Sequence, residues 1–431
     1  MDRFFGVTAA GSSIRQELLA GISTFLTMSF IVAVNPMFLE AAGIPFAAGF
    51  VATVAATAIG TAIMGLWARW PVAVAPGMGL NAYFAYGLVL GQGFIWQQAL
   101  AAVFVASVLF LLFSLSRLRS WLIGAIPASL RLGITAGIGL FLAMIGLQGM
   151  GLVVDDPDTL LRLGNLGSPA VLLSLAGLLV MAGLAARGMR GGILLTILGL
   201  SLVGWLSGIA EFGGIAAAPP VASAAFALDF SAVTSTAFMS VVFILFFLDF
   251  FDTTGTLTGI ADIAGKRSAD GSIENLDRAV VADTGASVVG SLLGTSSMTT
   301  YLESATGIRA GGRTGLTAMT VAALFLCCLF FEPLFASIPG FAAAPALVFV
   351  AAGFLAPLGQ LDWDDLASAV PVMLMAILMP LTFSIAAGIA VGFLAFCAIM
   401  LISGRGAEIN AGTWVITAFG GLWLAAPLFG G

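Results

Sequence analysis

Two aspartates, Asp249 and Asp252, lie three residues apart in the run FFLDFFDTTG, inside an apolar segment that begins at Phe238. Residues three apart on a helix are neighbours on one face, so the two carboxylates are expected to share a surface. An aspartate at the centre of a membrane helix costs about 2.5–3.5 kcal/mol on insertion scales. The pair is therefore expected to face the interior of a helix bundle, with polar partners or a ligand.

Two further acids extend this set, Asp283 in NLDRAVVADTGAS and Glu303 in TYLESATG. The sequence places no lysine or arginine at comparable depth, and it contains no histidine, so any proton chemistry has to use carboxylates. Desolvation and mutual repulsion disfavour the charged form of a carboxylate, which lets such groups take up a proton near neutral pH. Asp249 and Glu303 are therefore predicted to bind ligand and protons.

The other polar residues of these segments leave two interpretations open. Asp252, beside Thr254, could serve the ligand or could hold helices together, and Asp283, near a helix end, is expected to be structural. Asn81 offers both a donor and an acceptor, either to a ligand or to a neighbouring helix.

The composition requires that membrane helices position these residues. Of 431 residues, 60% are hydrophobic and only 8% are charged, whereas a soluble domain is about one quarter charged. The three cysteines lie in apolar runs without metal-ligand spacing, so no metal or cofactor is expected. No basic run predicts nucleic-acid binding, and no nucleophile–base pair predicts an enzyme.

Fourteen segments are long and apolar enough to be predicted as membrane spans. They cover residues 17–37, 46–67, 74–90, 96–116, 121–150, 169–187, 191–210, 237–264, 277–294, 295–310, 314–337, 341–359, 367–382 and 384–403.

If the N-terminus is cytoplasmic, the basic residues of the loops fall on the cytoplasmic side except Arg162, which predicts that orientation for a multi-pass protein. The membrane is expected to be a bacterial inner membrane. Among the cytoplasmic loops, one carries Arg117 and Arg119. An Ala- and Pro-rich external loop, 211–236, separates a first repeat, 14–210, from a second, 237–403. The tail 404–431 holds an apolar stretch, 412–428, that is long enough for a further helix.

The two halves share a pattern that predicts an inverted repeat. Ile-Pro at 126–127 and again at 338–339 is followed, 21 residues after the proline, by glutamine. Each half has seven spans, an odd number, so a repeated unit must insert with opposite topology. Chance similarity between glycine-rich helices is the alternative explanation.

Two spans at corresponding places in the halves are predicted to be broken. The third begins PVAVAPGMGLNAYFAYG, where prolines and glycines interrupt a helix, and the tenth begins GTSSMTTYLESATG. Each is expected to be a short extended segment followed by a half helix, starting near Tyr301 in the tenth. Paired broken spans indicate a binding site at the membrane midplane.

Four runs carry a resemblance to a known family: TFLTMSFIVAVNP, APGMGLNAYFA, FFLDFFDTTGTLTG and GTSSMTTYLESATGIRAGGRTGLTA. Together they resemble the nucleobase–cation symporter 2 family, and within it the AzgA-like adenine, guanine and hypoxanthine permeases. The resemblance implies an all-α fold of fourteen segments as two inverted seven-segment repeats, with short strands in segments three and ten, core and gate domains, and a homodimer in membrane lipid.

The resemblance also implies a function: import of a purine base together with protons, with the base at the midplane between segments three, eight and ten. Asp249, Glu303 and Asn81 correspond to the substrate-binding residues, and Asp252 joins the two acids in proton coupling. The candidates for stacking or supporting contacts are Phe25, Tyr83, Thr254, Thr300 and Asp283. SSMTT stands where many relatives have STTTT, which could alter substrate preference.

Other functions remain open. An anion transporter of the sulfate/bicarbonate type shares this fold, but it would place a basic residue or bare helix dipoles at the site, where Asp249 and Glu303 would repel an anion. A channel or a membrane enzyme is a third possibility, and an enzyme would need a nucleophile–base pair or a metal.

Overall fold

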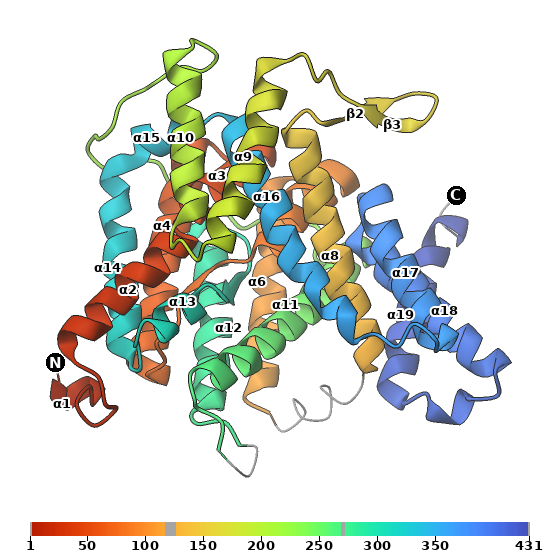
Figure 1. Cartoon of the computed structure of the whole chain (residues 1–431). Coiled ribbons are helices and arrows are strands. Elements are labelled where there is room, and N and C mark those ends of the chain that lie inside the picture. Colours follow the sequence, from red (N-terminus) through yellow and green to blue (C-terminus); the bar gives the residue numbers. More distant parts are fainter. Residues whose placement is uncertain (1, 117–125, 269–271, 430–431) are drawn as a thin grey trace. The chain divides into compact units, whose positions relative to one another are not determined.

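A computed structural model describes residues 2–116, 126–268 and 272–429 (Figure 1). Arg117, Arg119 and the first five residues of the predicted span 121–150 lie outside the described residues. The chain divides into two compact units: Met1–Leu115 with Leu173–Ala343, and Ser116–Leu172 with Ala344–Gly431. Each unit draws on both predicted repeats.

The first unit holds most of the helices. Its elements are α1 (Asp2–Phe5), α2 (Ile14–Met28), α3 (Ile31–Ala41), α4 (Phe46–Ile63), η1 (Met64–Ala68), β1 (Val74–Pro76), α5 (Met78–Ala82), η2 (Tyr83–Gly91), α6 (Trp96–Ser114), α10 (Gly192–Leu206), α11 (Thr236–Ile263), α12 (Leu276–Leu293), β4 (Met298–Thr300), α13 (Ser304–Arg309), α14 (Gly315–Cys328), η3 (Leu329–Phe331) and α15 (Glu332–Ala336).

The second unit is smaller. It contains α8 (Ala128–Gly149), β2 (Val153–Asp156), β3 (Leu160–Leu163), η4 (Ala356–Gln360), α17 (Leu366–Leu381), α18 (Ile385–Ile402), η5 (Gly406–Glu408) and α19 (Ala411–Phe429). The boundaries between the units fall within α9 (Pro169–Ala186) and α16 (Gly340–Leu355).

The predicted spans are confirmed as elements of the fold. Among the described residues, 9 helical stretches are long and apolar enough to cross a membrane, and α10 and α17 are shorter apolar helices. The remaining three predicted spans are α12 and the two broken segments, which completes fourteen. The predicted span 17–37 is not one helix, because α2 ends at Met28 and α3 begins at Ile31.

The third and tenth spans are broken as predicted, and their extended parts pair with each other. Strands β1 and β4 are antiparallel, with Val74 opposite Thr300 and Pro76 opposite Met298. The unwound backbone at this depth needs hydrogen-bond partners, and the pairing supplies them. The helix after β4 begins at Ser304, three residues later than predicted, because the Tyr301 N–H donates to the Ala73 carbonyl at 3.0 Å and so continues the pairing with the other broken span. The Tyr301 hydroxyl also donates to the Pro76 carbonyl, at 2.7 Å.

Glycines allow the helices of each unit to approach closely, as small-residue packing predicts. In the first unit, a Cβ built on Gly315 would lie 1.9 Å from the Gly65 carbonyl oxygen, which leaves no room for a side chain. In the second unit, a Cβ on Gly137 of α8 would lie 2.3 Å from the Met379 sulfur of α17.

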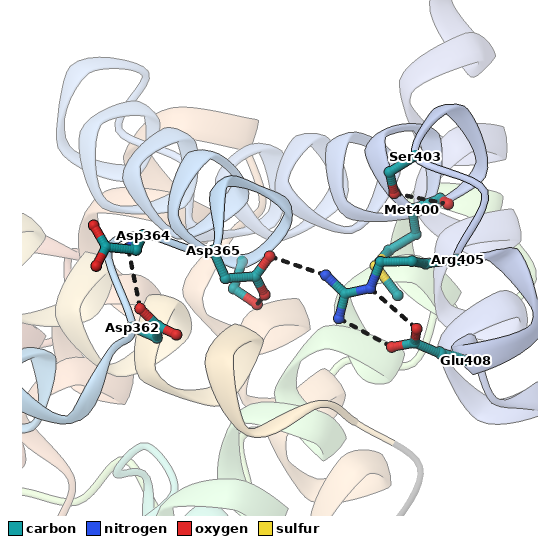
Figure 2. Close-up of polar contacts among 8 residues, drawn as sticks. Asp362, Asp364, Asp365, Met400, Ser403, Arg405 and Glu408 are labelled. Atoms are coloured by element: carbon teal, nitrogen blue, oxygen red, sulfur yellow. Dashed lines mark hydrogen bonds and ion pairs between the residues drawn. The ribbon is translucent and has the colours of Figure 1, made fainter.

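Charged residues of the second unit gather where α17 begins and α18 ends. Figure 2 shows Arg405 between Asp365 and Glu408, with a bidentate contact to Glu408 and a 3.0 Å bond to Asp365. Hydrogen bonds from Ser368 and Arg405 hold the pKa of Asp365 below its ordinary value. This ion-paired cluster lies at the helix ends and ties α17 to the segment after α18.

A β-hairpin was not predicted. Strands β2 and β3 pair from Val153 opposite Leu163 to Asp156 opposite Leu160. The Asp156 carboxylate accepts from two backbone N–H groups of the turn, at Asp158 and Thr159. This local capping organises the acidic loop that the sequence presents only as charged.

Candidate binding site

The acid-bearing helix α11 lies against both broken spans. It contacts β4, α13 and α5, all within the first unit. Asp249 and Asp252 on α11, Asn81 on α5 and Glu303 just before α13 therefore come from elements that touch one another. The convergence of these elements is what the sequence predicted, and their roles in binding stay predictions.

Asp249 is buried with an unused acceptor. The residue is 2% exposed, and its Oδ1 has no hydrogen-bond partner among the described residues. Buried polar atoms are nearly always paired, so an exception in a membrane interior needs an explanation. No ion pair to a lysine or arginine is formed by Asp249 within the described part of the chain. A bound donor group would satisfy the carboxylate.

Unpaired hydrogen-bonding groups also line the broken spans. The Asn81 amide nitrogen and the hydroxyls of Ser297 and Thr299 are buried and lack partners among the described residues. The Asn81 side-chain oxygen is already engaged by the Ser296 hydroxyl. The broken spans thus carry spare donors, while α11 carries a spare acceptor.

Strand alternation explains why these hydroxyls are spare. Residues two apart on a strand face the same side, so Ser297 and Thr299 face opposite to Met298 and Thr300. The Met298 side chain packs on α12, where a Cβ on Gly290 would lie 2.8 Å from it. Ser297 and Thr299 therefore face away from α12.

Asp283 of α12 is a satisfied buried acid. Its two oxygens accept from the hydroxyls of Thr253, at 2.5 Å, and Thr300, at 2.6 Å. One turn on, the Ser287 hydroxyl donates to the Met298 carbonyl of β4 at 2.8 Å and accepts from the Met298 N–H at 3.0 Å. These contacts fit the structural role expected of Asp283, although the residue is fully buried rather than near solvent.

Neighbouring threonines of β4 lead to different expectations. Thr300→Val removes a donor from a buried carboxylate, so we expect a loss of about 1–3 kcal/mol of stability. Thr299→Val removes a hydroxyl that meets no hydrogen-bond partner among the described residues, so the melting temperature of the detergent-purified protein should fall less than that of Thr300→Val. Equal destabilisation of both variants would contradict this assignment of the two hydroxyls.

Asp252 connects the acids electrostatically. It is half-buried, and its charge acts on Asp249, Asp283 and Glu303. Glu303 is also half-buried, and its backbone carbonyl accepts from the Thr27 hydroxyl at 3.4 Å. Ionisation of all four carboxylates at once would cost much electrostatic free energy, because like charges in a low-dielectric interior repel strongly.

The supporting candidates have mixed surroundings. The Phe25 ring packs edge-on against Phe325 with centroids 5.2 Å apart. The fully buried Tyr83 ring lies over Gly87, one turn along, and its hydroxyl lacks a partner among the described residues. Thr254 is half-buried. Stacking by Phe25 or Tyr83 and support by Thr254 stay predictions.

Sequence reasoning missed the individual polar residues that complete the site. Ser296, Ser297 and Thr299 were recognised only as part of a Ser- and Thr-rich run. The alternation of that run, once it is recognised as a strand, would have separated Ser297 and Thr299 from Thr300. Among the described residues, no cluster of three His, Cys, Asp or Glu side chains is placed to hold a metal ion.

Comparison with known proteins supplies the family. Residues 15–391 match the permease family. The chain is 42% identical to the adenine permease AdeP of Escherichia coli (strain K12) over 406 residues, which cover 94% of this chain and 91% of the relative. It is 41% identical to the guanine/hypoxanthine permease PbuO of Bacillus subtilis (strain 168) over 408 residues, or 93% and 94% of the two chains.

A solved structure confirms the fold class. The transmembrane domain of the bicarbonate transporter BicA from a cyanobacterium matches with a TM-score of 0.62 at 18% identity, covering 89% of this chain and 97% of that one. That fold consists of two seven-segment repeats with core and gate domains. The chain is a transporter rather than an enzyme, and it belongs to the permease family, in the nucleobase–cation symporter 2 group that its motifs resemble.

Proposed function

We propose that this protein imports purine nucleobases together with protons, by alternating access, with the base bound where α5, β4 and α13 meet α11. Relatives that are named as adenine permease and as guanine/hypoxanthine permease support the substrate class. The set of proposed binding residues is Asp249, Glu303 and Asn81, which lie on these contacting elements.

The observation that carries the proposal is the set of unpaired buried atoms. A purine presents ring N–H and amino donors beside ring-nitrogen acceptors. The free Oδ1 of Asp249 can accept from a donor of the base, and the Asn81 amide and the Thr299 hydroxyl can donate to its ring nitrogens. A flat, mostly neutral ligand would satisfy both kinds of group at once.

The same atoms argue against an anion as substrate. An anion carrier of this fold would need cationic groups or helix dipoles at its site. Asp249, with Asp252 and Asp283 near it, makes the region acidic, and no basic side chain is paired with Asp249 in the described part of the chain. The structural similarity to a bicarbonate transporter therefore supports the fold and does not support bicarbonate as the substrate.

Proton coupling is proposed for Asp249, Asp252 and Glu303. Proton uptake by one carboxylate would relieve the repulsion among them and make the site neutral enough to cross a membrane. The proton is then the coupling ion, and no other cofactor is needed. We further propose a homodimer in a bacterial inner membrane, with the N-terminus in the cytoplasm.

An uptake panel tests the function. Labelled adenine, guanine, hypoxanthine, xanthine and uracil are supplied to a host that lacks its own carriers and expresses this protein. We expect uptake of at least one purine and not of uracil, and collapse of that uptake on adding a protonophore. Uptake that ignores the protonophore would contradict proton coupling, and transport of none of the purines would contradict the substrate class.

A further inference from the structure

Glu17 is a buried carboxylate that the proposed site does not use. It lies on α2 with no exposed surface. Its Oε1 accepts from the Arg313 N–H at 3.0 Å, and its Oε2 accepts from the Thr314 N–H at 3.2 Å and the Thr317 hydroxyl at 2.6 Å. These donors belong to the turn between α13 and α14 and to the first turn of α14, where backbone N–H groups have no intrahelical partners.

Helix α2 also packs against α13 along the length of α13 (Figure 1). A Cβ on Gly307 of α13 would lie 2.1 Å from the Thr24 hydroxyl oxygen and 2.6 Å from the Ala20 carbonyl oxygen. At the other end of α13, the Thr27 hydroxyl donates to the Glu303 carbonyl. The half helix therefore lies flush on α2 from one end to the other.

Only a short length of chain lies between Glu303 and Arg313, the two residues whose backbones are hydrogen-bonded to α2. Only α13 (Ser304–Arg309) and the turn 310–312 separate Glu303 from Arg313. A shift of the turn away from α2 would thus pass directly to the residue that starts the half helix. A charged hydrogen-bonded anchor resists such a shift better than a neutral one, because its bonds are stronger.

We propose that Glu17 is a positioning residue for Glu303. By bonding the turn after α13 to α2, it fixes the half helix and so sets the affinity of the site for the base. The effect on affinity rests on the proposed function, whereas the anchoring of α13 can be measured without any substrate.

Glu17→Gln is the first test. Whichever way the amide is oriented, one oxygen becomes an NH₂ group that cannot accept from the α14 turn. We expect KM for purine uptake to rise about tenfold, the equivalent of one charged hydrogen bond, with an unchanged amount of protein in the membrane. Hydrogen–deuterium exchange of the purified protein should accelerate in residues 304–314.

Two further variants keep the test decisive. Thr317→Val removes one of the three donors and should shift KM and exchange in the same direction by less, and it carries the test if Glu17→Gln does not reach the membrane. Glu40→Gln, an exposed acid on α3, should change neither. A lower melting temperature with unchanged KM and unchanged exchange at 304–314 would make Glu17 merely structural and overturn the proposal. If the wild type takes up no purine, the proposed function fails, and the exchange measurement alone decides whether Glu17 anchors α13.

Discussion

Asp249→Asn is expected to abolish purine uptake while the protein still reaches the membrane. The amide has nearly the shape of the carboxylate, so the packing of α11 is kept. It replaces one acceptor oxygen with a donor and removes the charge. The lost bond to a charged acceptor is worth about 1.5–3 kcal/mol, a loss of about tenfold to a hundredfold in affinity, and the variant can no longer take up a proton at this position. Uptake of labelled base and direct binding to purified protein measure the two effects.

A matched control lies on the same helix. Asp262 is exposed near the end of α11 and is paired with Arg267. Asp262→Asn changes the same chemical group outside the proposed site, so uptake should remain close to wild type. Normal transport by Asp249→Asn would show that the buried carboxylate does not serve the base.

Glu303→Gln is expected to abolish accumulation of the base against its gradient. Glu303 joins Asp252 and Asp249 in one electrostatically coupled group, so a neutral side chain that cannot exchange a proton should break the link between proton entry and base entry. Uptake driven by an imposed pH gradient in proteoliposomes is the measurement.

Glu274→Gln serves as the control for this second variant. Glu274 has an exposed side chain, whose carboxylate is paired with Lys266 at 3.3 Å. It should leave gradient-driven uptake intact. If Glu303→Gln accumulates the base as well as Glu274→Gln does, Glu303 has no part in coupling.

Much of the fold could be predicted because apolar length and helix breakers are local signals. The spans follow from hydrophobic runs, and the breaks before α5 and α13 follow from Pro76, Gly77 and the Ser- and Thr-rich run at 295–300. The third and tenth spans could be recognised as partners because they occupy corresponding places in the two halves.

The remaining features depend on contacts between distant residues. The register that places Val74 opposite Thr300 joins residues more than two hundred positions apart, and nothing local specifies it. The three-residue error at the start of α13 arose because Tyr301 bonds the other broken span. Glu17 was overlooked because it lies near the polar N-terminal end of α2, where an acid is unremarkable in sequence.

The candidate acids could be predicted from the energetic cost of a charge in an apolar segment, but their hydrogen-bond partners could not be predicted. Four carboxylates in apolar runs stand out because charge is expensive there. That Asp283 is satisfied by Thr253 and Thr300, while Asp249 keeps a free oxygen, follows only from the packing of α12 and β4 against α11. This difference separates a structural acid from a proposed ligand-binding one.

The most direct test of the central claim is an experimental structure of the protein with a purine bound. We predict the base beside β4 and α11, with the Asp249 carboxylate and the Asn81 amide within hydrogen-bond distance of its ring or amino groups. A base bound elsewhere, or one whose polar groups all bond to other residues while the Oδ1 atom of Asp249 stays without a partner, would contradict the account.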